Sequence, residues 1–556
     1  MRLLVPRMAV VRLQPRTVSP ALRRWNSTAS SKTQQREPES FFTPAPGDDK
    51  PFMVTTPIFY VNASPHIGHL HSMVLTDTFA RFSALRHPDR PVLFSTGTDE
   101  HGMKIQQAAA KGGMSEKEFC DEVSQRFRNL ADKAETGYTD FVRTSEERHY
   151  AAVDAFWARL MASGSVYKGT HEGWYSVSDE CFYSEQQIEK ADDGKMIATE
   201  TGNEVVWSEE ENWKFRLGDY KDQLREWLQR DEAVHPWPMH ANIARQVDGM
   251  GELSISRPAS RVKWGVPVPG DPSQTIYVWV DALINYLTVA GFPGEMPAWP
   301  ADMHVVGKDI IRFHALHWPA LLSAAKLPLP KRVLAHAHWT MGNAKMSKSR
   351  GNVVDPIAAM DHYGPDAVRW YLMRSGGSLE GDSDYSAGEL SKAHAKLGAQ
   401  LGNLVQRILA PKLLAGVGES FERDADMDAT LSVLPEAIER RFEGYELTAA
   451  VGALEAALAD ANRFFSDNEP WAKTNTTREM AYAYATLRNV GILSRPIIPG
   501  KSEELLDRLG VPADERGWKD AQWNGELDVV EMKRRLEEAG KKFKGTTLFP
   551  RIDDKT

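Results

Sequence analysis

Residues 52–69 read FMVTTPIFYVNASPHIGH, and this stretch decides the fold class. Its first five residues are apolar or β-branched, a composition that predicts a short buried strand. A loop bounded by prolines follows, and from His66 to about Leu85 the apolar residues recur with the period of a helix. The ordered part of the chain is therefore expected to open with a strand, a loop and a helix.

The same order recurs immediately downstream. Val92–Thr96 predicts a second strand, residues 97–102 (GTDEHG) a loop, and the residues after them a second helix. Alternating strands and helices predict a parallel sheet, whose ligands bind beyond the carboxyl ends of the strands. The loop before His66 and the GTDEHG loop are both expected at that edge.

The rest of the chain divides by composition. Residues 164–273 are rich in aromatic residues, short alternating runs and turns, which predicts an insertion of mixed structure. Ile276–Val280 and His304–Val306 are predicted as returning strands of the sheet. From Ala387 to Ile497 alanine and leucine recur with helical period, which predicts an all-α domain, and Val530–Phe543 predicts one more, charged helix.

Two short motifs carry the chemistry. His66 and His69 stand in the first turn of a predicted helix, where backbone N–H groups and the helix dipole attract anions, and Gly68 lets a ligand approach the backbone. Alone, they are as readily two surface histidines or half of a metal site. Lys345-Met346-Ser347-Lys348-Ser349 supplies two cations and two hydroxyls in one loop, which suits a mobile phosphate clamp. Together, around a parallel α/β core, the motifs predict polyphosphate binding.

The charge of the chain is unevenly distributed. The 556 residues carry a net charge of −9, but the first 36 hold eight basic side chains and no acidic one. A segment rich in Arg, Ser and Thr without acids is typical of a mitochondrial transit peptide, and residues 37–50 then read as a linker. The alternative is a basic arm that binds nucleic acid. No apolar run is long enough to span a bilayer, so we expect no membrane contact.

Cysteine is scarce, with only Cys120 and Cys181 in the chain. Two cysteines cannot build a disulfide framework or a four-cysteine zinc site. The sequence therefore predicts no zinc and no other metal centre of its own.

With these features in place, the sequence resembles a known family. The two motifs match the two signatures of class I aminoacyl-tRNA synthetases, and their surroundings are similar to the methionyl-tRNA synthetases. The similarity runs from about Phe52 to about Ile498. The matching stretches are residues 55–62 (TTPIFYVN), 97–102 (GTDEHG), 254–257 (SISR), 277–282 (YVWVDA), 307–314 (GKDIIRFH) and 364–369 (GPDAVR).

The resemblance implies a Rossmann-type α/β catalytic domain of class I with a mixed α/β insertion, followed by an all-α anticodon-binding helical bundle. The insertion is expected to meet the acceptor end of the tRNA. The implied division is a transit peptide and linker at 1–45, the first catalytic half at 50–163, the insertion at 164–273, the second catalytic half at 274–340, the KMSKS loop with a stem-contact region at 341–386, the anticodon-binding domain at 387–512 and a tail at 513–556.

The implied reaction has two steps. L-Methionine attacks the α-phosphorus of ATP to give methionyl-adenylate and pyrophosphate, and the terminal ribose of tRNA(Met) then takes the methionine. The attacking carboxylate is already ionised, so positioning and charge stabilisation suffice without a general base. The implied catalytic residues are His66, His69, Lys345 and Lys348, and the implied contacts to ATP, which brings Mg²⁺, are His66, Gly68, His69, His338 and Lys348. The implied setting is translation in the mitochondrial matrix, with no obligate protein partner evident.

A methionine pocket must be apolar and aromatic with one or two polar tips, because a thioether is only a weak acceptor. By resemblance, it is formed by Ile58, Tyr60, Trp279, Tyr286 and His314, and Asp99 holds the substrate ammonium. Without the resemblance, Trp279 and Tyr286 read as core and Asp99 as a loop cap. Arg257 and Asp309 are expected to form an ion pair that supports the pocket, and a surface role is equally compatible with the sequence.

The anticodon readers are expected in the helical region. Asn403 and Arg407 are four residues apart and share a helical face, and Trp471 follows Glu469-Pro470, where a ring can be left exposed. These three match the family's readers, which would stack on unpaired bases and bond to their edges. The alternative for Trp471 is a buried core position, and for the whole region a dimerisation bundle.

Three other functions stay open at this point. Nucleotidylyltransferases also place a His-x-Gly-His at a strand–helix junction, but they lack a C-terminal helical bundle. A synthetase that has lost catalysis and only binds tRNA has no use for His66, His69 and Lys348. A cysteine-specific enzyme of class I needs zinc ligands that this chain lacks.

Overall fold

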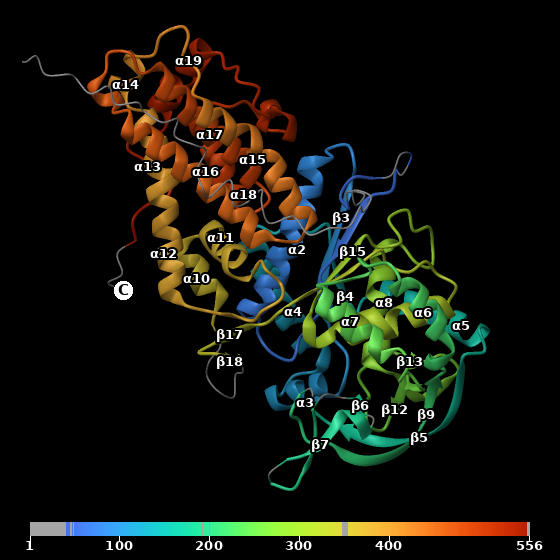
Figure 1. Cartoon of the computed structure of the whole chain (residues 1–556). Coiled ribbons are helices and arrows are strands. Elements are labelled where there is room, and N and C mark those ends of the chain that lie inside the picture. The colour runs from blue at the N-terminus through green and yellow to red at the C-terminus, as the bar shows by residue number, and fades with distance from the viewer. Residues whose placement is uncertain are drawn as a thin grey trace, which may run out of the picture.

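The structure is a computed structural model with an α/β lobe, an all-helical lobe and a β-rich insertion (Figure 1). In Figure 1 the helical lobe and the insertion lie at opposite ends of the molecule, with the parallel sheet between them. The structure describes residues 41–44, 47, 49–178, 181–183, 185–191, 193–199, 201–346 and 354–552, without the side chains of Gln186 and Lys345.

A seven-stranded parallel sheet forms the centre of the α/β lobe. Its strands are β1 (Phe52–Thr55), β2 (Phe59–Tyr60), β3 (Val92–Asp99), β4 (Asp140–Arg143), β10 (Val234–His235), β15 (Met303–Gly307) and β16 (Val333–His336). The order is β10-β16-β15-β1-β3-β2, and β4 also pairs with β3. The strands predicted at 52–56, 92–96 and 304–306 and the parallel α/β class are thus confirmed.

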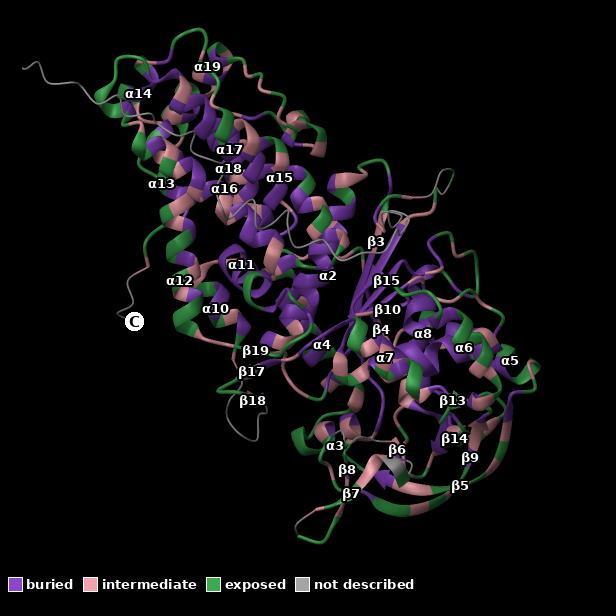
Figure 2. Ribbon diagram, in the orientation of Figure 1, coloured by how far each residue is buried: buried purple, intermediate pink, exposed green. Residues whose placement is uncertain are grey.

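Helices cover both faces of this sheet. They are α2 (Ile67–Arg86), α3 (Met103–Gly112), α4 (Glu116–Lys133), α5 (Glu147–Ala162), α8 (Val278–Ala290) and α9 (Trp318–Ala324). In β1, Phe52 and Val54 join the hydrophobic core that contains α2 and α4, whereas Met53 joins the core that contains α5, α8 and α9. Successive side chains of a strand point to opposite faces, so one strand contributes to both cores. Figure 2 shows the strands of this sheet mostly buried, and β1, β15 and β16 are buried throughout.

Two local predictions differ from the structure. Residues 276–280 were predicted as a strand, but β14 (Asp271–Ile276) ends there and α8 begins at Val278. Nearly all of α8 is buried, and a helix buried on all sides has a continuous apolar run that resembles a strand. The GTDEHG loop also begins later than predicted, because β3 continues to Asp99. Gly97 permits this extension, since a Cβ there would lie 2.0 Å from the carbonyl oxygen of Val142 in β4.

The insertion is mostly antiparallel sheet. A four-stranded sheet contains β5 (Val166–Ser176), β6 (Cys181–Tyr183), β9 (Val206–Phe215) and β11 (Leu253–Ser254), and smaller sheets contain β7 (Ile188–Lys190), β8 (Met196–Ala198), β12 (Ser256–Pro258), β13 (Pro267–Val268) and β14. The chain returns to the α/β lobe inside this region, because β10 is the edge strand of the central sheet and α6 (Lys221–Leu228) and α7 (Trp237–Gln246) flank it. Residues 164–273 are therefore not one continuous insertion.

The helical lobe confirms the all-α prediction and includes the charged helix predicted at 530–543. Its elements after the small strands β17 (Trp339–Met341), β18 (Ala344–Lys345) and β19 (Ser383–Asp384) are α10 (Pro356–Tyr363), α11 (Pro365–Gly376), α12 (Ala387–Leu397), α13 (Asn403–Ile408), α14 (Pro411–Ala415), α15 (Ala425–Glu443), α16 (Leu447–Asp467), α17 (Thr477–Ser494), α18 (Pro499–Arg508) and α19 (Val529–Lys542). Helix α19 contacts α14, α17 and α18 and contributes Met532 and Leu536 to the core. Within the described part of the chain, no helix is both long and apolar enough to span a bilayer.

A buried arginine joins the two lobes. Arg369 of α11 is fully buried, and its Nη2 lies 2.6 Å from Oδ2 of Asp77 in α2. The same guanidinium donates to the carbonyl oxygens of Ala134, Pro496 and Ile497. Helix α2, which begins at the His66 loop, is therefore tied to the turn between α17 and α18.

Part of the predicted linker is folded. Phe42 is fully buried against Phe52, Phe79 and Phe82 at the end of the sheet where β1 begins. The backbone N–H of Phe41 donates to Oε2 of Glu443 in α15 at 2.7 Å. Two phenylalanines of the predicted linker therefore pack into the α/β lobe, and Phe41 also contacts the helical lobe.

Candidate functional site

The two histidines of the first motif form the start of α2, next to the carboxyl ends of the strands. His66 is the N-cap, and its Nδ1 accepts the backbone N–H of Gly68 at 3.1 Å. The N–H of His66 in turn donates to Nδ1 of His69 at 3.1 Å, and the two rings stack with centroids 3.9 Å apart. Because both Nδ1 atoms accept, the neutral rings carry their protons on Nε2. Two oriented N–H donors thus reinforce a helix N-terminus that already favours anions.

The second motif is only partly described. A hairpin of β17 and β18 leads into it, and Asp384 anchors the hairpin by accepting hydrogen bonds from Thr340 Oγ1 at 2.7 Å and from the N–H of Asn343 at 2.9 Å. The side chain of Lys345 and the whole of Lys348 lie outside the described residues. Their assignment to phosphate remains a prediction.

The two residues expected to support the pocket have other contacts in the structure. Oδ1 of Asp309 lies 3.1 Å from Nε2 of His338, the residue predicted to contact ATP, and the expected pair with Arg257 stays a prediction. Arg257 lies buried in β12 of the insertion, and its Nη1 donates to Ser254 Oγ and to the carbonyl oxygen of Ser256. Its guanidinium also lies 4.2 Å from the centroid of the Tyr277 ring. The alternative surface role is excluded for Arg257 by its burial.

Three of the predicted methionine-binding residues meet in one aromatic cluster. The hydroxyl of Tyr286 lies 2.7 Å from Nε2 of His314, and Nδ1 of His314 lies 2.9 Å from the carbonyl oxygen of Ile310. Trp279 packs edge-on to His314 and stacks on Phe313 with centroids 3.8 Å apart. Phe313 was not identified from the sequence, although it lies in the matching stretch 307–314. The cluster is mostly apolar and has two polar groups, the hydroxyl of Tyr286 and the imidazole of His314.

Burial keeps the hydroxyl of Tyr286 and the imidazole of His314 neutral. Burial lowers the pKa of His314 to about 4 and raises the pKa of Tyr286 far above its usual value. The imidazole is therefore uncharged near pH 7, and its Nδ1–H donates to the Ile310 carbonyl while Nε2 accepts the tyrosine proton. His314 lies in a single π-helical turn, Phe313–His317, a distortion that often marks functional sites.

The other three predicted methionine-binding residues lie at the ends of neighbouring strands. Tyr60 in β2 is the register partner of Asp99 in β3, so their side chains lie close to each other. Asp99 is 9% exposed, and Ile58, like Trp279, packs against the hydrophobic core that contains Tyr286. An acid at the carboxyl edge next to an aromatic, apolar cluster is a suitable arrangement for the ammonium group of an amino acid.

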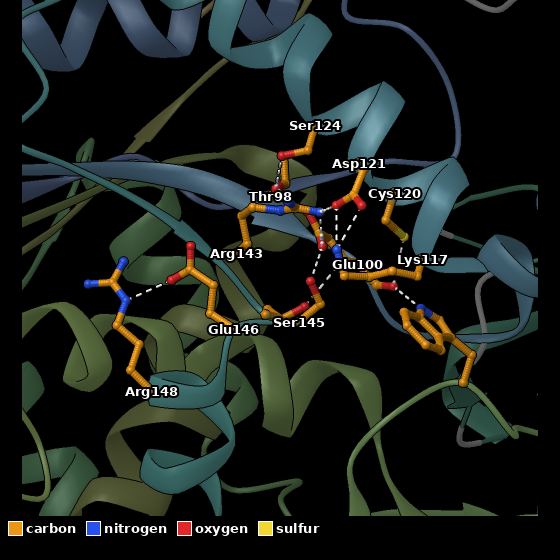
Figure 3. A network of polar contacts seen from close by, with 12 residues as sticks. Thr98, Glu100, Lys117, Cys120, Asp121, Ser124, Arg143, Ser145, Glu146 and Arg148 are labelled. Carbon is orange, nitrogen blue, oxygen red and sulfur yellow. Dashed lines mark hydrogen bonds and ion pairs between the residues drawn. The ribbon is translucent and has the colours of Figure 1, made fainter. Parts of the chain in front are cut away.

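A polar network that the sequence did not reveal surrounds Glu100, the residue after Asp99 (Figure 3). Glu100 is fully buried, and its carboxylate accepts hydrogen bonds from Thr98 Oγ1 at 2.8 Å, from Arg143 Nε at 2.7 Å and from Ser145 Oγ at 2.5 Å. Cys120 donates its thiol proton to the Glu100 carbonyl oxygen, and burial, aided by the Glu100 charge, raises the pKa of that thiol to about 12. Glu100 thus fixes the end of β3 against β4, and Cys120 stays a thiol.

The predicted anticodon readers are exposed at one end of the helical lobe. Asn403 and Arg407 are exposed on α13, and Trp471 is 45% exposed on the 3₁₀ turn Pro470–Ala472. Helix α14 contacts both α13 and this turn, and Lys412 of α14 donates to the carbonyl oxygen of Trp471 at 3.0 Å. The alternative that Trp471 is a buried core residue is therefore wrong.

The two cysteines lie in different parts of the α/β lobe and its insertion. Cys120 is buried in α4, and Cys181 lies in β6. Among the residues that the structure describes, His, Cys, Asp and Glu form no group of three or more that could hold a metal ion.

Comparison with protein families gives two matches that together span almost all of the described chain. The model described as "tRNA synthetases class I (M)" matches residues 52–195 and 192–409. The model described as "Anticodon binding domain of methionyl tRNA ligase" matches residues 415–556.

Individual relatives agree with the family models. The chain is 43% identical over 499 residues to a probable mitochondrial methionine–tRNA ligase of Schizosaccharomyces pombe, covering 85% of this chain and 92% of the relative. It is 40% identical over 542 residues to the human mitochondrial methionine–tRNA ligase, covering 90% of each. The fold matches the Mycobacterium tuberculosis methionyl-tRNA synthetase in complex with methionyl-adenylate, with a TM-score of 0.80, 36% identity, and coverage of 86% of this chain and 99% of that one. The chain belongs to the methionyl-tRNA synthetases, a family of the class I aminoacyl-tRNA synthetases.

Proposed function

We propose that this protein is a methionine–tRNA ligase of mitochondrial translation, which activates L-methionine with ATP and transfers it to the 3′ end of tRNA(Met). The proposal rests on two groups of residues at the carboxyl edge of the sheet, one suited to phosphates and one suited to methionine. Oriented histidine donors stand at the N-terminus of α2, and the Trp279–Tyr286–His314 cluster includes two residues of α8, a helix that contacts β3, the strand that ends at Asp99. Relatives named mitochondrial and the acid-free basic leader support the location in the matrix.

In the first step, the carboxylate of methionine attacks the α-phosphorus of ATP, and pyrophosphate leaves with its Mg²⁺. The nucleophile needs no base, so the task of the protein is to align the reactants and to stabilise charge on the phosphates. His66 and His69 supply Nε2–H donors from fixed rings. Lys345 and Lys348 are assigned to the pyrophosphate side, Gly68 to close contact with the nucleotide, and His338 to its adenosine end.

Methionine is held at both of its ends. Asp99 is assigned to the ammonium, and Ile58, Tyr60, Trp279, Tyr286 and His314 to the side chain. Neutral Tyr286 and His314 suit an uncharged thioether, which is a weak acceptor and would gain nothing from a formal charge. This neutrality disfavours charged amino acids of similar length, because a buried charge without a partner is costly.

In the second step, the acceptor end of tRNA(Met) meets the adenylate near the insertion, while the far end of the helical lobe reads the anticodon. Asn403, Arg407 and Trp471 are assigned to the anticodon because they are exposed together, and exposed rings and long polar side chains are what unpaired bases require. The sharpest test of the whole proposal is methionine-dependent exchange between ATP and pyrophosphate without tRNA. Exchange that depends on a different amino acid would reject the assigned substrate.

A further inference from the structure

A buried carboxylate bridges two histidines beneath the methionine site. Asp281 lies in the first turn of α8, with Oδ2 2.7 Å from Nδ1 of His101 and Oδ1 2.9 Å from Nε2 of His149. The three side chains are at most 1% exposed. This cluster belongs neither to the phosphate site nor to the methionine-binding residues assigned above.

The outer nitrogen of each histidine is also occupied. Nε2 of His101 lies 3.0 Å from the hydroxyl of Tyr150, and Nδ1 of His149 lies 2.9 Å from Oγ1 of Thr288. Burial alone would raise the pKa of Asp281, but the two rings outweigh burial and hold it at about 2. The carboxylate is therefore ionised and accepts one N–H from each ring, so that the orientation of both rings is fixed.

The cluster joins three segments that the chain keeps far apart. His101 follows β3, His149 lies in α5 and Asp281 lies in α8, at separations of 180 and 132 residues from Asp281. Asp99 stands two positions before His101, and Trp279 stands two positions before Asp281. The contacts therefore connect the segment assigned to the substrate ammonium with the helix assigned to its side chain.

We propose that Asp281 is a positioning residue of the methionine site, which fixes the segment of Asp99 relative to Trp279 and Tyr286 through His101 and His149. The proposal rests on the proposed function and deepens it. A single methionine molecule must reach both ends of its site at once, so an error in their spacing weakens its binding. ATP has no need of this spacing, because His66 and His69 belong to α2.

The Glu100 network complements this role. Glu100 connects the end of β3 to Arg143 in β4. The next residue, His101, contacts Asp281 in α8. Asp99 is thus followed by two anchored residues that hold to different elements. A buried ion cluster is by itself weak evidence for a contribution to stability, since apolar replacements are often as stable. Its connection of two substrate-binding segments gives this cluster a function in orientation.

The test compares Asp281→Asn with the wild-type enzyme in ATP–pyrophosphate exchange. The amide keeps the size of the side chain but can no longer accept from both rings. We expect KM for methionine to rise by about tenfold or more, since misplacement by about 1 Å can cost about a hundredfold. KM for ATP and kcat at saturating methionine are expected to stay within about threefold, because the phosphate site is untouched.

A matched control is Asp302→Asn at the opposite edge of the same sheet. Asp302 is also buried, and it pairs with Lys50 at 2.5 Å and with Lys331 at 2.9 Å. Losing its charge should lower the melting temperature without changing KM for methionine. Tyr150→Phe is the mild second variant, which removes only the hydroxyl at His101 and should raise KM for methionine in the same direction by a smaller factor.

The outcomes are distinct. If Asp281→Asn and Tyr150→Phe leave KM for methionine unchanged, or if Asp281→Asn lowers kcat alone, Asp281 is structural in the same sense as Asp302 and the proposal is wrong. If Asp281→Asn does not fold, Tyr150→Phe alone decides by the same criterion. Absence of methionine-dependent exchange in the wild-type enzyme would instead reject the proposed function, so the two failures cannot be confused.

Discussion

Replacing Trp471 by alanine tests the anticodon assignment and its magnitude together. If the ring stacks on an anticodon base, its loss removes about 1–3 kcal/mol of binding. Each ~1.4 kcal/mol is a factor of about ten, so kcat/KM for charging of tRNA(Met) should fall roughly fivefold to a hundredfold. Exchange without tRNA should stay at the wild-type rate, because the adenylate forms in the other lobe.

The effect on stability separates this assignment from simple packing. Truncating a fully buried tryptophan costs ~3–5 kcal/mol. Trp471 is 45% exposed, so only about half of its surface packs against the protein. We therefore expect Trp471→Ala to lower the free energy of unfolding by about 2 kcal/mol or less. Trp237→Ala is the matched control, since Trp237 is 59% exposed on α7 and has no assigned role. Normal charging by Trp471→Ala, combined with a destabilised helical lobe, would refute the assignment.

Three further predictions concern the pocket, the N-terminal segment and pH. Tyr286→Phe leaves Nε2 of His314 buried without its partner, which costs about 1–3 kcal/mol. KM for methionine should therefore rise about tenfold while KM for ATP stays constant. A KM for methionine equal to that of the wild-type enzyme would contradict the assigned pocket. Phe42→Ala should lower the free energy of unfolding by ~3–5 kcal/mol in a denaturant titration, whereas a linker residue would change it by less than about 0.5 kcal/mol. Burial lowers the pKa of His171, His235 and His314 to about 4, so the unfolded chain binds more protons than the folded one between about pH 6.5 and about pH 4. The melting temperature should therefore fall as pH is lowered through that window, and a constant or rising value would show that these rings are not buried as neutral groups.

The elements predicted best from the sequence are those that a local pattern of apolar residues encodes. The strands predicted at 52–56, 92–96 and 304–306 and the helices of the C-terminal half follow from apolar runs and helical periodicity, which act over a few residues. The start of α8 was missed because a helix buried on nearly all sides has no polar face to reveal its period. The folding of Phe41 and Phe42 was missed because two apolar residues between prolines and acids have no periodicity at all.

The site was predictable where a single motif contains the contact, and not where the contact is long-range. His66 and His69 interact within one helical turn, and Tyr60 and Asp99 meet through strand register. Arg257 and Asp309 each belong to a strong motif, yet nothing in a motif states which other motif it faces, so their expected ion pair stays a prediction. The Asp281 cluster was overlooked for the same reason.

The central claim is that methionine is activated with ATP at the sheet edge between His66 and the Trp279–Tyr286–His314 cluster. ATP–pyrophosphate exchange by the purified enzyme without tRNA, measured with each of the twenty amino acids, tests it most directly. We predict exchange with methionine, and kcat/KM lower by about a hundredfold for leucine, isoleucine and cysteine, in the range that an apolar pocket can discriminate. Faster exchange with any other amino acid than with methionine would contradict the account.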